Sequence, residues 1–182
     1  MYIRYVRVHL LVVCLLLCGM GGVRFAHAAT PDSIEQCLQQ GLAQVLAGKV
    51  PARQYMYLPG IVSRVFGPPA GQLDETNRKE AVNFMAARVQ ELIDAKRHKF
   101  PKPVIKVTGL KTRSGYPNIY GVYSTITVKG TPYELRVNGY FYSGQKCAVY
   151  GVVIERSWSL IQHLKDVAGM REKCAELTGM QC

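Results

Sequence analysis

The sequence predicts an α+β fold in which helices pack over one face of a curved, four-stranded antiparallel sheet around an apolar cavity. Up to about residue 100, apolar residues recur at intervals of three and four, which is the spacing of amphipathic helices. From Val104 onward they alternate with polar residues, as in strands, and short turn-like sequences join the alternating segments. After residue 158 the helical spacing returns. Helices that precede and follow a meander of strands are typical of α+β domains.

Residues 1–28 have the pattern of a bacterial export signal. Two arginines precede an apolar run over residues 10–18, and the small-x-small sequence Ala26-His27-Ala28 follows it. The apolar run is shorter than the about 20 residues that a membrane-spanning helix needs, so we expect cleavage before Ala29 rather than an uncleaved anchor. The remaining residues 29–182 have the size of one domain, which we expect to be located in the periplasm.

Three helices are predicted ahead of the strands, over residues 33–48, 59–66 and 75–97. Ser33 and Gln36 have the spacing of a capping box at the start of the first helix. A Gly-Pro-Pro sequence ends the second helix, and Pro101 follows the third. One face of the third helix is apolar, and the residues on it that we expect to line the cavity are Met85, Val89 and Leu92.

The four predicted strands cover residues 104–110, 118–128, 133–142 and 147–155. The turns between them, including Ser143-Gly144, are short enough for an antiparallel meander. Alternation along the strands makes one face of the sheet apolar and the other largely polar. The sheet residues that we expect to line the cavity are Val122, Ile126, Val137, Phe141 and Val153. A closing helix over residues 158–168 and a last helical turn over residues 171–177 complete the chain.

Four cysteines remain after cleavage, which is an even number in an oxidising compartment and predicts two disulfides. Cys174 and Cys182 are close in sequence and favour a local bridge, which leaves Cys37 to pair with Cys147. Pairing of Cys147 with Cys174, or free thiols packed as small apolar groups, are the alternatives.

Positive charge is concentrated where the long helix meets the first strand. The net charge falls from +11 to +8 when residues 1–28 are removed, because they contain three arginines and no acidic residue. No acidic residue occurs between Lys96 and Arg113, whereas this segment holds eight basic residues, counting His98. The candidates for docking a lipid headgroup or a partner protein are Lys96, Arg97, Lys99 and Lys102. A solvated rim that aids solubility is the alternative, and the export signal disfavours nucleic acid.

Catalytic and metal-binding patterns are missing from the sequence. Only His98 and His163 remain after cleavage, and neither has neighbours with metal-ligand spacing. No glycine-rich phosphate loop follows a strand, and Ser157 and Ser159 lack the glycines of a nucleophile elbow. The sequence therefore predicts a protein that is not an enzyme and needs no cofactor or metal.

Three segments carry a resemblance to a known family. Residues 61–67 resemble a short helix that ends in a bulky residue and glycine, and residues 73–84 resemble a polar cap that leads into a helix with a phenylalanine. Residues 149–161, with the sequence VYGVVIERSWSLI, resemble a strand-to-helix junction. In this order they resemble the periplasmic phospholipid-binding (MlaC-like, toluene-tolerance) components of bacterial lipid-transport ABC systems, over residues 57–177. This chain has Gly151 where that family usually has aspartate, and Arg156 where it has glycine.

The resemblance implies a monomeric carrier that passes phospholipid between membrane-anchored transport complexes. A phospholipid has about 30 methylenes, and exposing them to water would require on the order of 25 kcal/mol, so a carrier must enclose the acyl chains. Two other classes of function remain. One is a cone-shaped α+β enzyme with a pocket histidine or acid, for which Glu134 and Glu155 are the acids within the predicted strands. The other is an exported interaction module with a filled core.

Overall fold

The structure is a computed structural model that describes residues 29–142 and 146–182. The predicted export signal and the predicted turn at Ser143-Gly144 lie outside these residues. An antiparallel sheet and surrounding helices confirm the α+β fold, with five strands in place of the four expected. Within the described ranges, no helix has the length and hydropathy needed to cross a bilayer.

The sheet is a meander whose strands follow one another in chain order. Its strands are β1 (Val104–Arg113), β2 (Tyr116–Val128), β3 (Thr131–Tyr142), β4 (Lys146–Ile154) and β5 (Trp158–Ser159). The fifth strand lies where the closing helix was expected to begin. Glu155 and Arg156 both have positive φ, at 53° and 54°, so the chain reverses and pairs Trp158 with Ile154. The closing helix therefore begins only at Leu160, with Ser159 as its N-cap.

A bulge in β4 changes which of its residues face the interior. Asn138 of β3 pairs with Gly151, but the next residue, Gly139, pairs with Val149, so Tyr150 is an extra residue in β4. Val149 and Val152 consequently both point inward and are buried. Val153 pairs with Arg136 on the outer face, so the prediction that Val153 lines the interior is wrong.

The helices agree with prediction except at the beginning of the domain. They are α2 (Pro31–Gln40), α3 (Leu42–Leu46), α4 (Leu58–Phe66), α5 (Glu75–Lys96), α6 (Leu160–Lys165) and α7 (Met170–Thr178). The capping box consists of Thr30 and Ser33 rather than Ser33 and Gln36, and the first helix is broken at Gly41. A Cβ at Gly41 would lie 2.1 Å from the ring of Tyr55, so only glycine permits this close approach.

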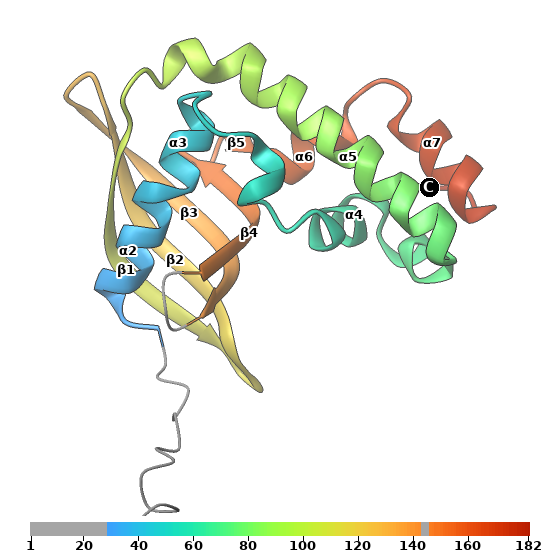
Figure 1. Ribbon diagram of the computed structural model, residues 1–182, viewed down its shortest axis with the longest axis horizontal. Coiled ribbons are helices and arrows are strands. Elements are labelled where there is room, and N and C mark those ends of the chain that lie inside the picture. Colours follow the sequence, from blue (N-terminus) through green and yellow to red (C-terminus); the bar gives the residue numbers. More distant parts are fainter. Residues whose placement is uncertain (1–28, 143–145) are drawn as a thin grey trace, which may run out of the picture.

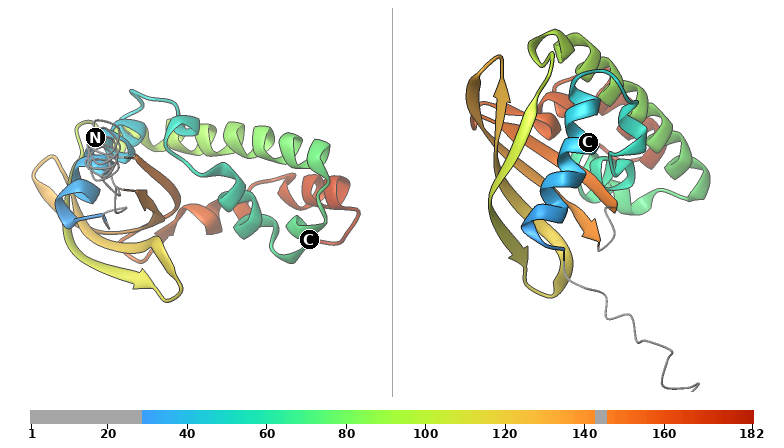
Figure 2. Two further views of the ribbon diagram at one scale, coloured as in Figure 1. Left: turned by 60° about the horizontal axis from the view of Figure 1, so that its bottom comes forward. Right: turned by 60° about the vertical axis from the view of Figure 1, so that its left-hand side comes forward.

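The sheet arches around α2, as Figures 1 and 2 show. The backbone of α2 lies close to β1 and β4 and farther from the two strands between them. It therefore spans the open side of an arch instead of lying flat on a sheet. Helices α4 to α7 form a second layer beside β4, in which the long helix α5 packs against α3, α4 and α7 rather than against the strands.

Helix α2 is fastened differently to the two sides of the arch. On one side, the side chains of Glu35 and Gln39 accept hydrogen bonds from the backbone N–H groups of Val107 (2.7 Å) and Ile105 (2.8 Å) on the free edge of β1. These bonds satisfy backbone donors that an edge strand would otherwise leave open. On the other side, a disulfide joins Cys37 to Cys147 of β4. This bridge and the Cys174–Cys182 bridge confirm the predicted pairing.

Candidate functional site

The inside of the arch is an apolar chamber filled by side chains of the sheet and of α2. Val122, Ile126, Val137 and Phe141 are each at most 1% exposed. They belong to the same core cluster as residues of the first two helices, whose largest fully buried side chains are Ile34, Leu38, Leu42 and Val45. The sequence shows this helical stripe, but the first helix lies outside the family resemblance, so sequence reasoning did not assign it to the candidate site.

Residues predicted on the long helix occupy the second half of the same core. Met85 and Val89 are fully buried, and Leu92 is half-buried against the cluster. Because α5 packs on other helices, these residues continue the apolar interior away from the sheet and do not form the roof of the arch. Contact of any of these residues with a lipid stays a prediction.

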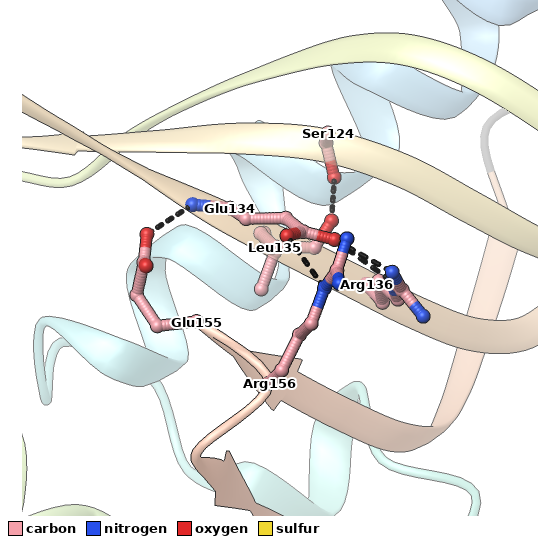
Figure 3. Close-up of polar contacts among 6 residues, drawn as sticks. All are labelled: Ser124, Glu134, Leu135, Arg136, Glu155 and Arg156. Atoms are coloured by element: carbon pink, nitrogen blue, oxygen red, sulfur yellow. Dashed lines mark hydrogen bonds and ion pairs between the residues drawn. The ribbon is translucent and has the colours of Figure 1, made fainter.

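The chamber contains hardly any polar atoms. Ser124 is the one buried polar residue in the described part of the chain, and its Oγ donates a hydrogen bond to the carbonyl of Leu135 (3.3 Å; Figure 3). The interior of the described domain therefore offers no charged group that could bind a headgroup or transfer a proton. It is suited to apolar chains alone.

The two strand acids that an enzyme could use are engaged outside the chamber (Figure 3). Glu134 forms ion pairs with Arg136 (2.8 Å) and Arg156 (3.2 Å). The hydrogen bond from Arg136 is the main cause that lowers the pKa of Glu134, with further lowering by the charge of Arg156. A carboxylate oxygen of Glu155 accepts a hydrogen bond from the backbone N–H of Glu134 (2.7 Å), so both acids hold the turn between β4 and β5 against β3.

The two histidines of the described domain have no arrangement suited to metal binding. The ring of His163 lies against Trp158, at 5.4 Å between centroids, and its Nδ1 is 3.0 Å from the carbonyl oxygen of Ser159. His98 is exposed. Among the described residues, no three His, Cys, Asp or Glu side chains are grouped so that they could hold a metal ion.

The backbone at Arg156 has a conformation that favours glycine, the residue that is usual at this position in the family that the sequence resembles. Its φ of 54° lies in the left-handed region, where glycine has no steric penalty. We therefore expect Arg156→Gly to be more stable than Arg156→Ala by about 1 kcal/mol, measured by urea unfolding. Lys129, with a φ of 51°, should show the same preference for glycine over alanine. Equal stabilities for the two Arg156 variants would contradict a left-handed residue at this turn.

The predicted docking residues lie at one end of the molecule. Lys96 is the last residue of α5 and is half-buried, and Arg97, Lys99 and Lys102 are exposed in the segment that leads to β1. Arg97 lies 3.9 Å from Asp94, and its side chain also packs over Gly48. The basic stretch of the sequence is divided in space, because β1 has 10 residues and its two ends are about 30 Å apart. Lys111 and Arg113 are thus at the opposite end from the four predicted docking residues.

Comparison with solved structures finds proteins of similar fold. The chain resembles the solved structure of a phospholipid-binding protein from Ralstonia solanacearum in complex with a phospholipid, with a TM-score of 0.57. The match covers 82% of this chain and 99% of that one, at 13% sequence identity. This chain shares its fold with a phospholipid-binding protein. No protein-family model matches the sequence, and no curated protein matches it either.

Proposed function

We propose that the protein binds a phospholipid, or a related apolar lipid, in the chamber between the arched sheet and α2. The observation that carries this proposal is the continuous apolar interior, in which the described residues place no charged group. The fold shared with a phospholipid-binding protein supports it. In this role the protein is a carrier, and the family that the sequence resembles extends that role to transfer between membrane complexes.

Lipid entry requires the chamber to open, because its lining side chains are packed against one another in this structure. The β1 side of α2 is the natural place to open. It is held there by side-chain hydrogen bonds from Glu35 and Gln39, each of which contributes about 1 kcal/mol, whereas the β4 side is held covalently. Helix α2 would then swing about the Cys37–Cys147 bridge, and the acyl chains would replace contacts between α2 and the sheet.

We also propose a location and partners for the protein. Residues 1–28 would direct the chain to the periplasm, where it would act as a monomer. The exposed cations Arg97, Lys99 and Lys102, with the half-buried Lys96 beside them, would contact a headgroup or a membrane-anchored transport complex. Among the described residues, Arg97 alone of these four cations has a carboxylate within 4.0 Å, that of Asp94 at 3.9 Å.

Purified protein should contain bound lipid. We expect organic extracts of protein from a bacterial periplasm to yield phospholipid by mass spectrometry, and delipidated protein to take up a fluorescent phospholipid. In a separate measurement, the mass of the intact protein should show that the chain begins at Ala29. Repeated extracts without lipid, together with no uptake at high protein concentration, would leave a filled core as the better account. A chain that retains residues 1–28 would instead contradict the proposed export alone.

A further inference from the structure

A second pocket lies on the outer face of the sheet, on the side opposite α2. Its volume is about 270 Å³, and it lies between α4 and the strands β1 to β4. Three cations line it, Arg64 from α4 and Lys111 and Arg113 from β1, and no acidic residue does so. Their presence in one pocket cannot be read from the sequence, since the whole of α5 lies between Arg64 and the other two cations in the chain.

The floor of this pocket is a row of residues across the strands. Lys111, Gly121, Asn138 and Gly151 are successive partners on β1, β2, β3 and β4. The two glycines have no side chains, so the amide of Asn138 lies in a depression between them. A Cβ at Gly121 would be 3.5 Å from Asn138 Oδ1, and a Cβ at Gly151 would be 3.3 Å from its Nδ2. The Asn138 amide makes no hydrogen bond with another described residue, so its N–H groups are available to a ligand.

The cations in the pocket have no acidic partners. Arg136 and Arg156 pair with Glu134, but Arg64, Lys111 and Arg113 have no carboxylate within 4.0 Å among the described residues. Arg64 stacks on the ring of Tyr150 at 4.4 Å, and Arg113 on the ring of Tyr116 at 5.0 Å. Stacking orients a guanidinium group by its face and leaves its N–H edge free to donate. Two such arginines, a lysine and an amide donor form a set that matches the oxygens of a phosphate group.

The surroundings of the pocket indicate where that phosphate is presented. Exposed tyrosines lie beside it, with Tyr116 52% and Tyr123 40% exposed. Tyrosine and basic side chains together are typical of surfaces that contact lipid headgroups, because the ring enters the interface while the cation stays in water. Lys106 lies further along the outer face of β1 and extends the positive surface.

We propose that this pocket binds the phosphate of an anionic phospholipid at a membrane surface and so docks the outer face of the sheet on the bilayer. The site is distinct from the apolar chamber, which lies on the opposite side of the sheet. It is also distinct from the group of Lys96, Arg97, Lys99 and Lys102, which lies at the other end of β1. Docking through it does not require that the chamber hold cargo.

Flotation of the protein of residues 29–182 with lipid vesicles tests the proposal. We expect binding to phosphatidylglycerol vesicles, little binding to phosphatidylcholine vesicles, and weakening of the first by salt. The triple variant Arg64→Gln, Lys111→Gln, Arg113→Gln should lose at least about tenfold in affinity for phosphatidylglycerol vesicles, since it removes three charges near the surface. Its matched control is Lys49→Gln, Arg53→Gln, Arg171→Gln, which removes the same charge at exposed residues outside the pocket. The control should keep most of the binding.

A single isosteric variant distinguishes binding in the pocket from attraction of the whole positively charged protein to anionic vesicles. Asn138→Asp adds one negative charge to the floor and changes the shape hardly at all, so it should weaken vesicle binding severalfold more than Thr127→Asp on the same face. Circular dichroism would show that both variants are folded. Vesicle binding by the triple variant that equals that of its control would overturn the proposal. Binding of inorganic phosphate at Asn138 by NMR, without vesicle binding, would overturn the membrane as the source of the phosphate. Lipid extraction from the chamber is scored separately, so a failure of the carrier function leaves this outcome unaffected.

Discussion

Ile126→Asp is expected to destabilise the domain by roughly 3–5 kcal/mol and to abolish lipid uptake. Ile126 is 0% exposed, and its strand partners are Ile105 on β1 and Tyr133 on β3. A carboxylate at this position would have no described cation to pair with inside the chamber. It would either be buried as a charge or be protonated, and both are unfavourable in an apolar interior.

Urea unfolding would measure this loss of stability, and titration with a fluorescent phospholipid would measure uptake. Thr127→Asp is the matched control, because Thr127 is adjacent, half-buried and on the outer face opposite Val104 and Pro132. It should cost no more than about 1 kcal/mol and leave uptake intact. If Ile126→Asp does not fold, Ile126→Ala provides the measurement, since it should cost about 2–4 kcal/mol through the cavity it leaves. A fully stable Ile126→Asp variant that still binds lipid would show that the inward face of β2 is assigned wrongly.

The inward face of β2 could be predicted because alternation is a local property. Val122 and Ile126 have polar or small neighbours on both sides in sequence, and pairing without a bulge between β2 and β3 keeps that phase across the sheet. The same reasoning failed at Val153. Val149, Gly151 and Val153 have the spacing of one strand face, but the extra residue at Tyr150 changes the phase between them. Only the pairing of β4 with β3 reveals this bulge.

Prediction of the helices failed where tertiary contacts decide. The start of α2 was displaced because Ser33 and Gln36 match the Ser/Thr-x-x-Glu/Gln pattern, whereas in the structure Ser33 is itself the reciprocal partner of Thr30. The break at Gly41 depends on the ring of Tyr55, which follows 14 residues later in the chain and packs back on Gly41. The distribution of the basic residues in space also could not be predicted from the sequence. The sequence presents one basic stretch, whereas β1 separates it into two surfaces that we assign to different partners.

The disulfide between Cys37 and Cys147 should contribute more stability than the one between Cys174 and Cys182. The first closes a loop of 110 residues and the second a loop of 8. On the chain-entropy model these loops correspond to about 5 and about 2.5 kcal/mol, because a longer loop removes more conformations from the unfolded chain. The first bridge also holds α2, the cover of the chamber, against β4.

We therefore expect Cys37→Ala, Cys147→Ala to lower the free energy of unfolding by about 4–5 kcal/mol, and Cys174→Ala, Cys182→Ala to lower it by about 2–3 kcal/mol. Urea unfolding under oxidising conditions measures both, and each double variant serves as the control for the other. The first variant should also exchange the amide hydrogens of α2 faster than those of α5, because α2 then lacks its covalent link to β4. Equal losses of stability, with α2 as protected as in the parent, would show that the apolar contacts of α2 hold the cover closed without the bridge. In that case lipid entry would have to open the chamber against those contacts on both sides, and the hinge about Cys37 would be wrong.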